Sequence, residues 1–353
     1  MTPGRGLFVA GREIGPSARP FVIAEMSGNH NHSIGRALAI VDAAADAGAH
    51  ALKIQTYTAD TITLDIGRDE FVISDPDSLW SGRSLYSLYE EAHTPWEWHE
   101  PIFARARERG MIPFSTPFDE SAVDFLEALD TPCYKIASFE NTHLPLIRKV
   151  AATGKPLIMS TGMATEAELA EAVDAARGAG CADLLLFKCT STYPATPANT
   201  NLASIPHMRE RFGCLVGLSD HSMGIGVSVA AVALGAVAIE KHFTLARADG
   251  GVDAAFSMEP DEMRALVVET ERAWQALGRV AYGPTEAERP SVQFRRSLYV
   301  AEDMRAGDAF TPTNLRVVRP GLGLPPKHYE EMLGKRVNRD MPKGTPVSWE
   351  MVE

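Results

Sequence analysis

Between residue 20 and about residue 280 the chain alternates between two hydrophobic patterns. Short apolar runs rich in β-branched residues are typical of buried strands. Longer Ala-rich segments with charged residues at helical spacing are typical of amphipathic helices. The predicted strands begin at residues 21, 51, 111, 133, 156, 183, 215 and 238. The predicted helices span residues 33–47, 97–109, 119–129, 144–153, 165–179, 203–212, 224–235 and 259–277.

Strict alternation of eight strands with helices, over roughly 250 residues, matches a (β/α)₈ TIM barrel. A doubly wound open sheet is the alternative. It usually has fewer strands, and the chain has no strand–GxGxxG–helix opening. The Gly pattern in GIGVSVAA, after Met223, is better explained by the packing of a helix start. The pattern therefore predicts an α/β fold with a catalytic barrel over residues 1–281.

Three segments depart from this alternation. Residues 57–96 form the longest irregular segment, and long loops at the C-terminal end of a barrel often form lids or binding walls. A polar, Pro-containing stretch at 282–293 predicts a linker. Residues 294–353 read as short strands and turns and predict a small second domain, near the lower size limit for an independent core. We expect it to pack against a barrel, either its own or a neighbour's.

Composition narrows the range of partners. The formal net charge of -12 argues against nucleic acid and anionic membranes, because both require a basic face. The chain has no apolar run of about 18 residues that could span a membrane, and its N-terminus lacks a signal-peptide core. The four cysteines are scattered without CxxC spacing, which indicates reduced, mostly structural thiols. We expect a cytoplasmic protein.

The ends of the predicted strands are polar, whereas their beginnings are apolar. Catalytic residues of TIM barrels project from the C-terminal strand ends, and unpaired charge inside a barrel is costly. Any one of these polar residues could be a local cap. The complete set of eight polar ends favours an active site.

Two histidines stand at the ends of neighbouring predicted strands. The imidazoles of His221 and His242 are expected to converge, and two histidines with open coordination positions suit Mn²⁺, Mg²⁺ or another divalent ion. Glu25 or Asp253 is a candidate to complete the coordination shell. The alternative is a pair of histidines whose hydrogen bonds are satisfied within the core.

Two lysines, Lys53 and Lys135, lie on converging strands among hydroxyl side chains. Ammonium groups supply charge and hydroxyls supply directed donors, which is what a phosphate dianion requires. A Schiff-base lysine is the competing interpretation. The second lysine and the histidine pair favour phosphate and metal. The hydroxyl residues of this cluster are Thr116, Ser138, Ser191 and Ser219.

Nine ordered motifs across the whole chain together resemble the sialic acid synthase family. The SGNHN turn, the TPWEWH segment and RADGGVDAAFS look closest to its pseudaminic acid branch, and RPGLGLPP looks like the antifreeze-like (SAF) domain that follows the barrel in this family. The nine motifs are AEMSGNHN (24–31), KIQTYTADT (53–61), FSTPFD (114–119), KIASFEN (135–141), STGMAT (160–165), KCTSTYP (188–194), GLSDHS (217–222), IEKHFT (239–244) and DGGVDAAFS (249–257).

The resemblance implies condensation of phosphoenolpyruvate with an amino-sugar aldehyde, in a dimer whose C-terminal domains cross over to the partner's barrel. The pseudaminic branch implies a 2,4-diacetamido-2,4,6-trideoxy-altrose acceptor. N-acetylmannosamine or a legionaminic acid precursor is the nearest alternative. A Schiff-base aldolase and a non-catalytic sugar-binding barrel are alternatives of a different class. A role in cell-surface polysaccharide synthesis or flagellin glycosylation also follows from the resemblance.

The resemblance also implies residue roles. His221 and His242 would bind Mn²⁺ or Mg²⁺, with Co²⁺ as a further option. Glu140 would lie near the reacting carbons, and Arg319 would reach in from the partner's C-terminal domain. Ser191 departs from the family pattern, which usually has Asn there. The phosphoenolpyruvate residues would be Lys53, Thr116, Lys135, Ser138 and Ser219, and the sugar would face Glu25, Gln55, Tyr193 and Asp253.

Overall fold

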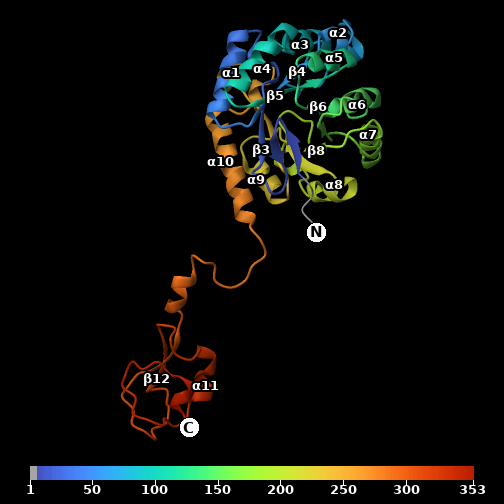
Figure 1. The fold of residues 1–353 in the computed structure, drawn as a ribbon. Coiled ribbons are helices and arrows are strands. Elements are labelled where there is room, and N and C mark those ends of the chain that lie inside the picture. Colours follow the sequence, from blue (N-terminus) through green and yellow to red (C-terminus); the bar gives the residue numbers. More distant parts are fainter. Residues whose placement is uncertain (1–5) are drawn as a thin grey trace. The chain divides into compact units, whose positions relative to one another are not determined.

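The computed structural model describes residues 6–353, in two compact units, 6–278 and 279–353. The first unit contains a closed parallel barrel of eight strands in the order β10-β3-β4-β5-β6-β7-β8-β9 (Figure 1). The strands are β3 Phe21–Glu25, β4 Ala51–Thr56, β5 Ile112–Pro117, β6 Tyr134–Ile136, β7 Leu157–Ser160, β8 Leu184–Cys189, β9 Leu215–Ser219 and β10 Ala238–His242. The predicted TIM barrel is confirmed.

A helix follows each barrel strand along the chain and packs outside the sheet (Figure 1). These helices are α1 Ile34–Asp46, α4 His99–Glu108, α5 Glu120–Ala128, α6 Leu144–Ala151, α7 Glu166–Gly178, α8 Ser204–Phe212, α9 Gly226–Ala233 and α10 Pro260–Leu277. Side chains cap several N-termini: Ser33, Asp119 and Thr165 accept hydrogen bonds from backbone N–H groups of the first turn. No helix among the described residues is long and apolar enough for a membrane crossing.

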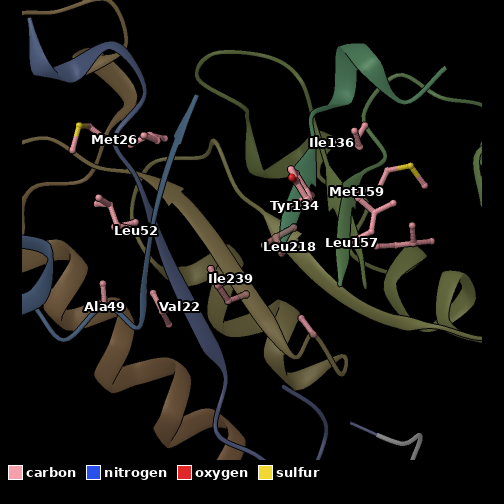
Figure 2. Packing of buried hydrophobic residues seen from close by; sticks show 14 of the residues in the cluster. Val22, Met26, Ala49, Leu52, Tyr134, Ile136, Leu157, Met159, Leu218 and Ile239 are labelled. Carbon is pink, nitrogen blue, oxygen red and sulfur yellow. The ribbon is translucent and has the colours of Figure 1, made fainter. Parts of the chain in front are cut away.

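Side-chain alternation along the strands separates two cores. In β3, Phe21 and Ile23 point into the barrel and belong to the inner cluster, whereas Val22 and Ala24 belong to the outer one. The outer cluster fills the space between strands and helices, where Val22, Leu52, Leu157 and Ile239 pack (Figure 2). The next inward-facing residue of β3 after Ile23 is Glu25. The side chains that face into the barrel therefore form the apolar core first and then, at the strand end, place polar groups at the barrel mouth.

The N-terminal hairpin of β1 Leu7–Val9 and β2 Arg12–Ile14 packs against the inner cluster. Leu7, Val9 and Ile14 are buried against residues that begin the barrel strands. The hairpin therefore closes the N-terminal end of the barrel and leaves the opposite end for a site.

The segment 57–96 is more regular than predicted. It contains α2 Ala59–Ile62 and α3 Leu85–Ala92, so the prediction of an irregular loop is wrong for these residues. The Ser84 side chain caps α3 by accepting from Ser87 N. Buried Leu88 and Ala92 lie four residues apart on one face of α3, a helical spacing that the aromatic and acidic composition of the segment obscured.

The second unit has its own small core. Strands β11 Ser297–Val300 and β12 Leu315–Val318 pair antiparallel, and α11 Tyr329–Met332 follows. Leu298, Phe310 and Val347 are among its fully buried residues. A short 3₁₀ helix, η8 Arg289–Phe294, lies where the sequence suggested a linker.

Gly217 provides a test of the inner core. A Cβ at this inward-facing position of β9 would lie 2.5 Å from the Phe187 ring and 2.6 Å from the Ala238 carbonyl oxygen. Gly217→Ala should therefore lower the free energy of unfolding of the barrel by about 1–3 kcal/mol, measured by urea denaturation.

Gly226→Ala is the matched control, because a Cβ there, in the first turn of α9, meets no atom within 4 Å. It should be neutral or stabilising by up to about 1 kcal/mol. Equal destabilisation by both variants would contradict the packing explanation.

Candidate active site

A cavity of about 510 Å³ opens at the C-terminal end of the barrel. Strand ends and the turns that follow them form its floor, and the segment 57–96 forms one wall. Predicted site residues that line the cavity are Glu25, Lys53, Gln55, Lys135, Ser138, Glu140, Tyr193, Ser219, His221, His242 and Asp253. Side chains that lie far apart in the sequence thus meet in one space of ligand size.

Three predicted residues do not line this cavity. Thr116 lies beneath the floor, where its hydroxyl accepts a hydrogen bond from Lys53 Nζ at 3.2 Å. The Ser191 hydroxyl lies 3.8 Å from the Cys189 sulfur. Arg319 follows β12 in the second unit, and the role assigned to it stays a prediction.

The two histidines meet at the mouth of neighbouring strands β9 and β10. The ring centroids of His221 and His242 lie 5.3 Å apart, and Tyr193 packs against the His221 ring at 4.5 Å. Nδ1 of His242 is buried without a hydrogen-bond partner, 3.6 Å from Asp253 Oδ2. Burial and neighbouring cations hold the pKa of His242 well below its usual value, so its imidazole is neutral.

These two imidazoles fit a divalent metal ion. Neutral imidazole is a metal ligand, and Nδ1 of His242 has no hydrogen-bond partner, with the Asp253 carboxylate 3.6 Å away. At His221, burial opposes the charge, but the contacts with Cys189 and Thr190 outweigh it and raise the pKa, so metal binding there must displace a proton. Nδ1 of His221 donates to the Thr190 carbonyl at 3.0 Å, the kind of contact that orients a metal-binding histidine. Across residues 6–353, no group of three or more His, Cys, Asp or Glu side chains is arranged to hold a metal. The assignment of His221 and His242 as metal ligands stays a prediction.

Two lysines and two glutamates share the cavity floor. Lys53 pairs with the Glu25 carboxylate, and Gln55 donates to Glu25 at 3.0 Å. Glu240 Oε1 lies 3.9 Å from Lys53 Nζ and 3.6 Å from Lys135 Nζ. All four charged side chains are at most 5% exposed, so each depends on the others for its charge.

The lysines differ in their surroundings. Burial opposes the charge of Lys53, but the carboxylates of Glu240 and Glu25 outweigh it and raise its pKa. Burial dominates at Lys135 and lowers its pKa, although Glu240 opposes the shift. Lys135 also donates to the Ser160 hydroxyl at 2.7 Å. The cavity floor thus contains one lysine, Lys53, that holds its proton firmly, beside a second, Lys135, that loses its proton more easily.

Comparison with known proteins places this chain in a family. The NeuB family profile matches residues 40–282, and the SAF domain profile matches residues 295–353. The chain belongs to the NeuB family. A pseudaminic acid synthase of Campylobacter jejuni is 44% identical over 324 residues, covering 92% of this chain and 94% of the relative. A pseudaminic acid synthase of Helicobacter pylori is 40% identical, covering 95% and 98%.

Solved structures agree with this assignment. The N-acetylneuraminic acid synthetase of Leptospira borgpetersenii, crystallised with citrate, superimposes with a TM-score of 0.72 at 29% identity. The match covers 83% of this chain and 97% of that one. The predicted sialic acid synthase family and its SAF domain are therefore confirmed, and the barrel mouth of this NeuB-family chain is its candidate active site.

The wall of this NeuB-family site is apolar. Trp80 donates from Nε1 to the Val252 carbonyl at 2.9 Å and packs against the Tyr193 ring at 5.8 Å. These contacts tie the segment 57–96 to the turn that carries Asp253. The apolar and aromatic side chains that the segment presents to the cavity are Tyr57, Ile62, Ile73, Trp80, Leu85, Leu88, Tyr89 and Ala92.

Four further polar residues line the cavity. Glu240 and Ser160 belong to the predicted polar strand ends but received no individual role, whereas Ser27 and Cys189 were missed. Glu240 lies two residues before His242, and this spacing on one face of a strand could have indicated its role. Ser160 ends β7 in the same way. Ser27, after β3, donates to the Asp253 carboxylate in the turn after the neighbouring strand β10, a contact that no sequence pattern signals. Cys189 lines the cavity beneath His221, although we expected the cysteines to be mostly structural.

Glu140 is the cavity carboxyl whose protonation can be tested through stability. Burial raises its pKa to about 7, and its Oε2 has no hydrogen-bond partner. The unfolded carboxyl ionises near pH 4.5. Between these values the folded state binds the extra proton, so this group makes the fold less stable as pH rises, with the full penalty above pH 7.

Glu140→Gln should remove this penalty. We expect it to raise the free energy of unfolding by about 1–3 kcal/mol at pH 8 and to have little effect at pH 5, where the folded carboxyl is already protonated. Urea denaturation at the two pH values measures the difference. Glu97→Gln, at an exposed position, is the control and should show no such pH dependence. An equal effect of Glu140→Gln at both pH values would contradict the assignment.

Proposed function

We propose that this chain condenses phosphoenolpyruvate with 2,4-diacetamido-2,4,6-trideoxy-altrose and releases phosphate, as a pseudaminic acid synthase. The observation that carries the proposal is the convergence of two histidines and two lysines in one cavity. The identity to pseudaminic acid synthases supports the acceptor. The apolar wall supports it as well, because a 6-deoxy sugar presents a methyl group where N-acetylmannosamine has a hydroxyl.

Lys53 and Lys135 are proposed to hold the phosphate and carboxylate of phosphoenolpyruvate, with hydrogen bonds from Ser138 and Ser219. Thr116 would position Lys53 from below through the contact at 3.2 Å. The substrate must compete with Glu25 and Glu240 for the two ammonium groups. Binding of the anion therefore rearranges ion pairs that already exist and leaves neither lysine without a partner.

His221 and His242 would hold a divalent ion, Mn²⁺ or Mg²⁺, which when bound supplies Lewis-acid polarisation of the sugar aldehyde. Gln55, Tyr193 and Asp253 would orient the sugar. Each of these roles is proposed from position and residue type. Asp253 is itself held by Ser27, so its carboxylate has a defined direction.

The bonds change in two stages. C3 of the enol phosphate attacks the aldehyde carbon, the π electrons of the carbonyl move to its oxygen, and positive charge develops at C2. The resulting alkoxide becomes a hydroxyl when it takes up the proton that water releases in the second stage. The ionised Glu140 would stabilise the positive charge at C2. Water then adds at C2 and loses a proton, which we assign to Glu25 as base. The tetrahedral intermediate expels phosphate, and C2 becomes the ketone of the nine-carbon acid.

The assignment of Glu25 makes a kinetic prediction. Glu25→Gln should lower kcat by about 10²- to 10⁴-fold, the usual contribution of a general base. Phosphoenolpyruvate should still bind, because its own anionic groups can replace the Glu25 carboxylate beside Lys53. Steady-state phosphate release and calorimetric titration measure the two quantities. Glu13→Gln on β2, remote from the cavity, is the control. Near-normal turnover of Glu25→Gln would exclude Glu25 as the base.

A panel of acceptors tests the proposed substrate. With phosphoenolpyruvate and Mn²⁺, the 2,4-diacetamido-2,4,6-trideoxy-altrose should give a kcat/KM at least about tenfold above that for N-acetylmannosamine or the legionaminic acid precursor. The discrimination is limited because a single methyl group in an apolar pocket contributes little. A higher kcat/KM with either alternative sugar would show that this sugar is the acceptor and would contradict the pseudaminic acid assignment.

The same phosphate-release assay distinguishes the proposed metal-dependent synthase from a Schiff-base aldolase. The proposed chemistry predicts loss of phosphate release with EDTA, recovery with Mn²⁺, and no covalent adduct after borohydride treatment with either substrate. A borohydride-trapped adduct on Lys53 or Lys135 would instead establish imine chemistry. Absence of binding to either substrate would favour a non-catalytic barrel.

A further inference from the structure

A second buried ion pair lies behind the site, on the helix-facing side of β9 and β10. Because side chains alternate along a strand, Glu240 and His242 point into the cavity, and Lys241 between them points outward. Asp220 occupies the equivalent outward position just after β9. Lys241 Nζ lies 3.1 Å from Asp220 Oδ2, and the two side chains are 1% and 0% exposed.

Every polar atom of this pair is used. Lys241 Nζ also donates to the carbonyl oxygens of Ser222 at 2.5 Å and Gly224 at 3.0 Å. Asp220 Oδ1 accepts from the Ser222 backbone N–H at 2.8 Å and from its hydroxyl at 2.6 Å. Asp220 Oδ2 accepts from the Ser228 hydroxyl of α9 at 2.7 Å. The ammonium group thus fastens the turn that joins β9 to α9.

This turn carries His221. Its neighbours in the chain, Asp220 and Ser222, both belong to the network, and its own carbonyl accepts from Ala195 N at 3.0 Å. The backbone on both sides of His221 is therefore fixed from outside the barrel. A well-packed apolar pair in the same place would avoid the cost of burying two charges. A required turn geometry accounts for a buried network of this kind.

We propose that Lys241 is a positioning residue for the metal site: paired with Asp220, it holds the turn after β9 so that the His221 imidazole meets that of His242. The proposal rests on the proposed function in one respect, the use of these two histidines by a divalent ion. Lys241 itself touches neither the cavity nor a substrate.

The test is the affinity of the full-length protein for Mn²⁺ alone. It is measured by calorimetry and by the electron paramagnetic resonance signal of free Mn²⁺. Lys241→Met should weaken Mn²⁺ binding by at least about tenfold, the usual effect of losing a group that orients a metal ligand. Phosphoenolpyruvate affinity without metal should stay within about threefold, because Lys53 and Lys135 are untouched. A merely structural role would not separate the two affinities.

The double variant Lys241→Met/Asp220→Asn guards against a folding defect, since it leaves neither charge buried without its partner. We expect it to retain a cooperative thermal transition and the weakened Mn²⁺ affinity. Tyr134→Phe is the matched control. It removes another fully buried, outward-facing polar group, whose hydroxyl donates to Glu127 at 2.6 Å and fixes no turn that carries a histidine of the site. Its Mn²⁺ affinity should equal that of the wild type.

The outcomes distinguish failure of the positioning role of Lys241 from failure of the proposed synthase function. Wild-type Mn²⁺ affinity in the double variant would overturn the positioning role and leave the proposed function standing. Equal weakening in Tyr134→Phe would also overturn it, because the effect would then reflect general stability. If the wild type and His242→Ala bind Mn²⁺ equally, the metal site itself is wrong, and both proposals fall.

Discussion

The period-two alternation of side chains in a closed parallel barrel determines most of what this molecule does. Each strand has one inward row, and that row must be apolar where the barrel is packed and polar where it opens. β10 shows the transition within five residues: Ala238 lies in the inner core, and Glu240 and His242 reach the cavity. A shift of one residue in register would exchange His242 for Lys241 and bury the wrong charge. Fold and chemistry are therefore specified by the same positions.

Electrostatic balance is the second constraint on the site. Four charged side chains in the cavity floor are nearly inaccessible to water: Lys53, Lys135, Glu25 and Glu240. A buried charge is stable only when a charge of opposite sign lies beside it. The barrel solves this problem by mutual pairing, which leaves the opposed ammonium groups available to an anionic substrate. Glu140 has no such partner, and burial raises its pKa to about 7. At Glu240, burial is outweighed by Lys135 and Lys53, which lower the pKa of that carboxyl, whereas at Glu25 burial prevails over Lys53 and raises the pKa. One cavity thus holds carboxyls of different proton affinity.

The sequence predicted the barrel well because its signal is repeated eight times. The eight barrel strands and the eight helices that follow them were recognisable from periodicity, and the strand ends identified His221, Lys53 and Lys135 as residues that share one mouth. Contacts between loops that are distant in the sequence could not be predicted in this way. The Ser27–Asp253 hydrogen bond joins residues that are 226 positions apart, and the Trp80 contact to Val252 spans 172. Helix α3 was not predicted because Tyr, Ser and Glu make up much of its sequence. Only its buried residues Leu88 and Ala92 indicate the face that packs against the core.

The outward-facing rows carry a further lesson about how such a site is built. An active-site side chain needs a direction as well as a position, and direction is set by the backbone on both sides of it. At His221 that backbone is held from the helix layer, by groups that a search of cavity-lining residues would pass over. Lys241 was visible in the sequence as one of three polar residues in a row, Glu240 to His242. Alternation assigns the outer two to the cavity. The middle one then needs a different explanation, because a lysine facing the helix layer stays charged only if the turn beside it supplies acceptors.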